Sequence, residues 1–261
     1  MNRIDRKFAE LKAKGEKALI PFVTAGDPDL ETTERLVPAL FAAGADLVEL
    51  GVPFSDPVAE GPVIQRASRR ALDGGVTLAK IFDLIRRLRA KTDGPLLLML
   101  YMNSIFRPGT DLFFRRCAET GVDGVIVPDL PYEERGEIQG AAERNGVYPI
   151  RMVAPTSHDR IAKIAAGAKG FLYCVSSTGV TGTRSRFTTD FDSFFGAVKR
   201  SAKIPCAVGF GISGPEQAKA MASYCDGVIV GSAVVKIVER EKRAAAAPVA
   251  EFVRSLKSAV R

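Results

Sequence analysis

Three carboxylates lie within twelve residues in the stretch ELGVPFSDPVAEGP, residues 49–62. Glu49 ends an apolar run, and Asp56 and Glu60 follow in a segment rich in proline. A carboxyl group that is removed from water keeps its proton to a higher pH, because burial disfavours the charged form. Such a group can give and take protons near neutral pH. The residue types and spacing therefore favour acid/base chemistry, with Glu49 as the leading candidate.

The strand that must position Glu49 follows from side-chain alternation. In an extended chain Leu47, Glu49 and Gly51 lie on one face, and Val48 and Leu50 lie on the other. If the apolar pair packs against helices, Glu49 points to the opposite side, into the interior of a barrel. The residues alone leave open a purely structural glutamate that is paired with a lysine in that interior.

Short apolar runs recur along the whole chain, and they are nearly continuous, as strands buried on both faces should be. They cover residues 18–26, 45–51, 95–101, 124–129, 148–155, 170–176, 205–211 and 227–232. The segments between them carry apolar residues at helical spacing, for example residues 77–91, where Thr77 is placed as an N-cap. Ahead of the first run, Ile4, Phe8 and Leu11 predict a short amphipathic helix.

Eight strands that alternate with helices in 261 residues predict an α/β fold, a single (β/α)8 TIM barrel with an extra N-terminal helix. We expect one domain over residues 1–261. A doubly wound open sheet is the alternative. Such a sheet usually has a glycine-rich turn after its first strand, whereas this chain has TAGDPD there.

Two glycine-containing turns follow the seventh and eighth predicted strands, in VGFGISGPEQ and VGSAVV. Glycine lets backbone N–H groups approach a ligand, and the N-terminus of a following helix favours an anion. This fold commonly binds phosphate at these two turns. The candidates are Gly211, Ser213, Gly231 and Ser232. The small-residue segment 176–187, after the sixth strand, is a candidate lid over a phosphorylated ligand.

Composition excludes several other classes of function. The net charge is +7, but basic residues are spread over many helices among acids, so we expect no nucleic acid partner. No apolar stretch approaches the roughly 20 residues of a membrane helix, and residues 1–17 do not read as a signal peptide. With four cysteines in apolar runs, a cytoplasmic setting is expected. The single histidine, His158, cannot build a multi-histidine metal site, so no metal is expected.

Seven motifs taken together resemble the tryptophan synthase α subunit family. They are IPFVTAGDPD, DLVELGVPFSDPVAEGPVIQRAS, GVDGVIVPDLPYEE, APTS, SSTGVTG, VGFGIS and DGVIVGSAVV, in family order over about residues 18–235. The resemblance implies a lyase that cleaves indole-3-glycerol phosphate to indole and glyceraldehyde 3-phosphate by a retro-aldol reaction. It also implies no cofactor in this chain, and an α2β2 heterotetramer with a β subunit that carries pyridoxal phosphate.

The resemblance also assigns site residues. Glu49 falls at the position of the family's acid/base, and Glu60 at that of its second catalytic carboxylate. By the same resemblance, the walls of the indole site are Phe22, Met99 and Ile126, and the other substrate contacts are Asp129, Tyr173 and Thr181. The phosphate contacts are Gly182, Phe210, Gly211, Gly231 and Ser232, and the partner contacts are Pro53 and Asp56.

Three positions depart from the family pattern. Glu60 stands where the family has aspartate, and Ser104 stands where it usually has proline. Val58 occupies the place of a longer leucine or methionine, and we expect that this gives the longer acid room to fold back. Because of Glu60, two alternatives stay open: a cleavage-impaired partner that activates a β subunit, and a lyase that releases indole without a partner.

Overall fold

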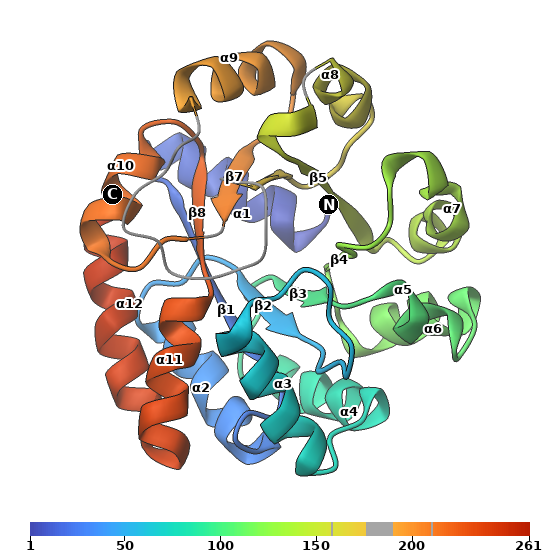
Figure 1. The fold of residues 1–261 in the computed structure, drawn as a ribbon, viewed down its shortest axis with the longest axis vertical. Coiled ribbons are helices and arrows are strands. Elements are labelled where there is room, and N and C mark those ends of the chain that lie inside the picture. Colours follow the sequence, from blue (N-terminus) through green and yellow to red (C-terminus); the bar gives the residue numbers. More distant parts are fainter. Residues whose placement is uncertain (158, 176–189, 210) are drawn as a thin grey trace.

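The protein is a closed parallel barrel surrounded by helices, as Figure 1 shows. The computed structural model describes residues 1–261 except 158, 176–189 and 210. Each strand pairs with its sequence neighbours, and β8 closes the barrel against β1. The strands are β1 (Ala18–Thr24), β2 (Val48–Gly51), β3 (Leu96–Met99), β4 (Gly124–Ile126), β5 (Tyr148–Val153), β6 (Leu172–Val175), β7 (Cys206–Gly209) and β8 (Gly227–Val230). The (β/α)8 barrel predicted from the sequence is confirmed.

Apart from α1, which precedes β1, the helices form the outer layer and alternate with the strands along the chain (Figure 1). They are α1 (Arg3–Lys14), α2 (Leu30–Ala42), α3 (Pro62–Asp73), α4 (Leu78–Arg89), α5 (Met102–Phe106), α6 (Thr110–Thr120), α7 (Gly136–Arg144), α8 (Arg160–Ala165), α9 (Phe191–Ser201), α10 (Pro215–Ala222), α11 (Ser232–Glu241) and α12 (Ala246–Val260). Thr77 caps α4 as predicted, since its side chain accepts a hydrogen bond from the backbone N–H of Lys80.

Strand alternation divides the core into two layers. Residues that point outward, such as Val48 and Leu50 of β2, pack with the helices in one large apolar cluster. Residues that point inward, such as Leu47, pack with one another and with α1 in a smaller cluster inside the barrel. Glu49 therefore has its side chain on the interior face, as the sequence pattern predicted.

Helix α1 closes the end of the barrel at which the strands begin. Its residues Ile4, Phe8 and Leu11 are buried in the inner cluster, which confirms the predicted amphipathic helix. The loops that follow the strands lie at the opposite end, where the strands stop.

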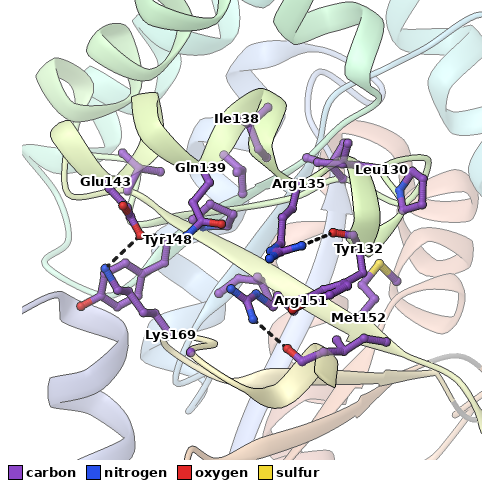
Figure 2. A pocket seen from close by; sticks show the side chains of 18 of the residues that line it. Leu130, Tyr132, Arg135, Ile138, Gln139, Glu143, Tyr148, Arg151, Met152 and Lys169 are labelled. Carbon is purple, nitrogen blue, oxygen red and sulfur yellow. Dashed lines mark hydrogen bonds and ion pairs between the residues drawn. The ribbon is translucent and has the colours of Figure 1, made fainter. Parts of the chain in front are cut away.

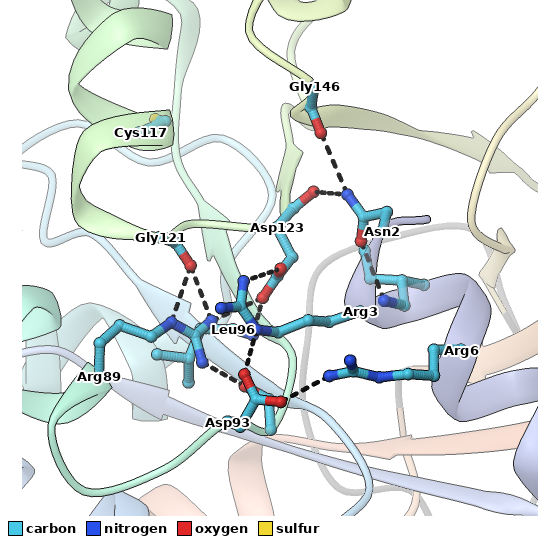
Figure 3. A network of polar contacts seen from close by, with 12 residues as sticks. Asn2, Arg3, Arg6, Arg89, Asp93, Leu96, Cys117, Gly121, Asp123 and Gly146 are labelled. Atoms are coloured by element: carbon cyan, nitrogen blue, oxygen red, sulfur yellow. Dashed lines mark hydrogen bonds and ion pairs between the residues drawn. The ribbon is translucent and has the colours of Figure 1, made fainter.

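A network of buried charge holds this closed end together, and Figure 3 shows it from close by. Asp123, just before β4, is 4% exposed and accepts hydrogen bonds from the side chain of Arg89 at 2.6 Å and from that of Arg3 at 3.0 Å. The same carboxylate accepts from the backbone N–H of Leu96 at 2.9 Å. The network thus joins α1, α4, β3 and β4.

Within the described residues, no helix is long and apolar enough to cross a membrane. The four cysteines are free and buried, in agreement with their predicted place in the core.

We expect Asp123→Ala to lower the free energy of unfolding by about 3 kcal/mol, because it leaves the largely buried guanidinium of Arg89 without its carboxylate. Urea denaturation measures the change. The control is Asp93→Ala, whose side chain is 69% exposed while it pairs with Arg3 and Arg6, and it should cost less than about 1 kcal/mol. Equal losses in the two variants would contradict a special role for the buried acid.

Candidate active site

Glu49 is the most deeply buried acid in the barrel interior. It is 1% exposed, and its Oε2 has no hydrogen-bond partner among the described residues. Burial raises the pKa of its carboxyl group to about 8, and the nearby Glu60 adds to the increase. At neutral pH this side chain therefore carries a proton for most of the time, and it lies within β2, where it lines a cavity that a ligand could reach.

Glu60 is held at the same end of the barrel by Tyr101. The Tyr101 hydroxyl donates a short hydrogen bond to Oε2 of Glu60 and accepts one of 3.0 Å from the backbone N–H of Ala59. The Tyr101 ring stacks on Phe54, with ring centroids 4.9 Å apart. Burial raises the pKa of Glu60, while the hydrogen bond from Tyr101 opposes that rise. The loop after β2 is thus fastened to the end of β3 through one phenol group.

Both glutamates line one cavity at the C-terminal ends of the strands. The cavity is also lined by Phe22, Ile64, Met99, Tyr173, Gly211, Ile212, Ile229, Gly231 and Ser232. Its volume is about 30 Å³, enough for one or two water molecules. A ligand with an aromatic ring therefore requires some of these side chains, or the loop after β2, to move outward.

Two glycines have a structural reason to be glycine. The ring of Phe22 lies so close to Gly51 that a Cβ atom there would be 2.4 Å from it, so a side chain would displace the ring. Gly211 has a φ of 86°, in the left-handed region that favours glycine. The first brings an aromatic ring beside Glu49, and the second shapes the turn after β7.

The described structure brings most of the predicted site residues together. Phe22, Met99, Tyr173, Gly211, Gly231 and Ser232 share the cavity with the two glutamates. Ile126 is fully buried in the inner cluster but does not line the cavity. The predicted Thr181, Gly182 and Phe210 lie outside the described residues, as do His158 and the candidate lid at 176–187.

Asp129 and Ser213 bind backbone or side-chain groups outside the cavity. The carboxylate of Asp129 accepts a hydrogen bond of 3.0 Å from the backbone N–H of Met102, at the start of α5. Ser213 donates through its backbone N–H and its hydroxyl to Gln217, each at 2.8 Å. Asp129 still acts on the site at longer range, since its charge contributes to the raised pKa of Glu60.

Of the two residues predicted as partner contacts in the loop after β2, one is exposed and the other is buried. Asp56 is exposed, and the hydroxyl of Ser55 donates to its carboxylate. Pro53 is buried, so it has little surface of its own to offer a partner in this state. The expectation that Val58 makes room for Glu60 is wrong, because the Val58 side chain is 71% exposed and does not border the cavity.

Sequence reasoning missed two kinds of site residue. Tyr101 follows Met99 by two positions, so the same alternation that placed Met99 inward could have indicated it. Ile64 comes from α3 rather than from a strand, and no spacing in the sequence distinguishes it from the other buried residues of that helix.

A closed parallel barrel with a buried acid pair and glycine turns at the C-terminal end of its strands has the architecture of a (β/α)8-barrel enzyme, whose active site lies at that end. Comparison with known proteins narrows the class. The profile of the family described as tryptophan synthase alpha chain matches residues 8–261, so the chain belongs to the tryptophan synthase alpha chain family. This confirms the resemblance seen in the sequence and the enzyme class, a carbon–carbon lyase of tryptophan biosynthesis.

Individual relatives agree with the family assignment. The tryptophan synthase alpha chain of Caldanaerobacter subterraneus subsp. tengcongensis is 50% identical over 240 residues, which cover 92% of each chain. The crystal structure of the subunit alpha from Legionella pneumophila is 36% identical, with a TM-score of 0.90 over 100% of this chain and 98% of that one. A chain of the tryptophan synthase complex from Pyrococcus furiosus is 35% identical, with a TM-score of 0.86 over 93% of this chain and 98% of that one.

The raised pKa of Glu49 predicts a dependence of stability on pH. Between the ordinary value of 4.5 and about 8, the folded state binds one proton that the unfolded state lacks. The free energy of unfolding should therefore fall as pH rises through this window, by up to about 1.4 kcal/mol per pH unit, and level off above it. Glu49→Gln should abolish this part of the slope. Urea denaturation at a series of pH values measures the difference.

The exposed Glu251→Gln provides the matched control for that series, since Glu251 lies on the outer surface of α12. Its curve should run parallel to that of the unmodified protein. Parallel curves for Glu49→Gln as well would show that Glu49 is ionised in the folded state.

Proposed function

We propose that this chain is the α subunit that cleaves indole-3-glycerol phosphate to indole and glyceraldehyde 3-phosphate by a retro-aldol reaction. The observation that carries the proposal is the buried, protonated Glu49, whose Oε2 is unpaired among the described residues, in one cavity with Glu60. A group with a pKa of about 8 can act both as the acid and as the base of one reaction.

The proton moves in a closed cycle in this mechanism. Glu49 donates its proton to C3 of the indole ring, which places a positive charge on the ring and its nitrogen. The resulting carboxylate then removes the proton from the hydroxyl on the carbon attached to C3. As that hydroxyl becomes a carbonyl, the carbon–carbon bond breaks and its electron pair restores the neutral indole. Glu49 ends protonated, ready for another substrate.

In this proposal Glu60 stabilises the positive charge that develops on the indole N–H. A carboxylate fixed beside a developing charge lowers the energy of the transition state. The hydrogen bond from Tyr101 supports this role, because it favours the ionised form of Glu60 and fixes its position. The same contact also favours cleavage over the alternative of a cleavage-impaired partner, since the longer acid has a donor fitted to it.

The phosphate group is proposed to bind at the turns after β7 and β8. Gly211, Gly231 and Ser232 lie on the same cavity as the two acids, and Ser232 begins α11, whose N-terminus favours an anion. Family resemblance adds Gly182 and Phe210, which lie outside the described residues.

The proposed partner is a β subunit that carries pyridoxal phosphate, in an α2β2 assembly. Support comes from the similarity to a chain of the Pyrococcus furiosus tryptophan synthase complex. Asp56 is the proposed contact, because it is exposed on the loop that carries Glu60; Pro53 would contribute only if that loop moved. We also propose that residues 1–261 act as one domain in the cytoplasm.

We expect Glu60→Gln to lower the turnover of indole-3-glycerol phosphate by about 100-fold, the scale of losing one electrostatic stabiliser. Binding of glycerol phosphate should change little, because the phosphate turns are intact. Turnover is measured as indole formation, by the isolated chain and in the presence of a β subunit. Binding of glycerol phosphate is measured by calorimetry. Turnover equal to that of the parent would end the assignment of charge stabilisation to this carboxylate.

Two further variants serve as controls for that experiment. Tyr101→Phe keeps the charge of Glu60 but removes its donor, so it should lower turnover by less than Glu60→Gln does. Glu60→Asp withdraws the carboxylate by about 1.5 Å, one carbon–carbon bond, and takes it away from Tyr101. Its activity should be equal to or below that of the parent.

Asp56→Ala should weaken activation by a β subunit without loss of thermal stability, because the Asp56 carboxylate is exposed and, among the described residues, accepts a hydrogen bond only from Ser55. The measurement is the ratio of indole formation with and without β, alongside a thermal melt. Asp111→Ala, which removes an acid that is 82% exposed at the start of α6, is the control. An unchanged activation ratio in Asp56→Ala would remove Asp56 from the interface.

A further inference from the structure

A second cavity lies outside the barrel, and it shares no lining residue with the cavity that holds Glu49 and Glu60. It has a volume of about 130 Å³ and lies between α7 and the outer side of β4 and β5. Figure 2 shows it from close by. Its apolar wall includes Val127, Ile138 and Ile164. The site is therefore roomy and largely apolar, as small-molecule sites usually are.

Strand β5 differs from the other strands at this place. Its inward residues, such as Ile150, belong to the inner cluster, so by alternation Arg151 points out toward the helices. The outward positions near it are apolar, for example Leu172 on β6, which pairs with Arg151, and Val125 on β4. Arg151 donates to the backbone carbonyls of Ile164 and Ala166, at 2.8 and 2.5 Å, and so closes the end of α8.

Cations gather around one aromatic ring at the edge of this cavity. The guanidinium of Arg135 is 4.0 Å from the centroid of the Tyr132 ring, that of Arg151 is 5.5 Å away, and the ammonium of Lys163 is 5.7 Å away. The labelled side chains of Tyr132, Arg135 and Arg151 lie together in Figure 2. Burial lowers the pKa of Arg151, and the nearby charge of Arg135 also acts to lower it.

This positive charge is only partly neutralised. Among the described residues, neither Arg135 nor Arg151 forms an ion pair with a carboxylate, and Arg135 donates to the backbone carbonyl of Tyr132 at 2.9 Å. The one acid lining the cavity, Glu143, pairs with Lys169 at 3.7 Å. Two guanidinium groups therefore face an apolar cavity with donor N–H groups to spare.

We propose that this cavity is a binding site for a small aromatic carboxylate, distinct from the substrate site. The carboxylate lies against the guanidinium groups of Arg135 and Arg151, whose planar donors match its two oxygens. The aromatic ring fills the apolar space beside Ile138 and Ile164. An uncharged ligand of the same shape leaves the cations unpaired and binds more weakly.

The test titrates the full-length chain with 3-phenylpropionate by calorimetry, and with 3-phenylpropanol as the uncharged counterpart. We expect saturable 1:1 binding of the acid and at least about tenfold weaker binding of the alcohol, the scale of one charge-assisted hydrogen bond. Arg135→Gln should weaken binding of the acid by about tenfold or more. This variant spares Arg151, which α8 needs to keep its end closed.

Two controls locate the binding. Arg144→Gln changes the last residue of α7, an arginine that pairs with Asp111 and does not line the cavity, and should leave the affinity unchanged. Glu60→Gln removes a repelling carboxylate from the substrate cavity, so it would tighten binding there but should have no effect at the second site. Absence of saturable binding, an affinity unaffected by Arg135→Gln, or tighter binding in Glu60→Gln would each overturn the proposal.

Discussion

The proposed chemistry depends on the removal of one carboxyl group from water. Glu49 lies on the interior face of a closed barrel, where the charged form loses its hydration and Oε2 has no hydrogen-bond partner among the described residues. The side chain avoids the free-energy penalty of a buried charge because it keeps its proton at neutral pH. Because burial is the largest cause of the raised pKa of Glu49, and the charge of Glu60 adds to it, every feature that keeps water out of the cavity also keeps this side chain protonated.

The buried acids at the two ends of the barrel have different hydrogen-bond partners. At the end where the strands begin, Asp123 is paired with Arg89 and Arg3, and its remaining capacity is used by a backbone N–H. At the other end, Glu49 keeps an oxygen with no partner among the described residues. A fully paired carboxylate stabilises the fold, whereas a buried carboxyl group with an unpaired oxygen is available to a ligand, so in the proposed function stability and reactivity are separated along the barrel axis.

The sequence predicted the elements well because their signals are local. Apolar runs and side-chain alternation located the strands and turned Glu49 inward correctly. Prediction from the sequence failed for contacts that depend on the tertiary structure. The direction of Val58 in a loop has no periodicity to predict it, and the bond between Tyr101 and Glu60 joins residues 41 positions apart. Ile64 reaches the site only through the placement of α3 against the strand ends.

The phenol of Tyr101 connects the position of a loop with the acidity of a side chain. It holds both the carboxylate of Glu60 and the backbone of Ala59, so an outward movement of this loop breaks both bonds together. Such a movement also lets water reach Glu60. The two equilibria, loop opening and proton binding, are therefore linked thermodynamically, and the linkage is reciprocal. Any molecule that holds the loop in one position also changes the proton affinity of the site, without touching either acid.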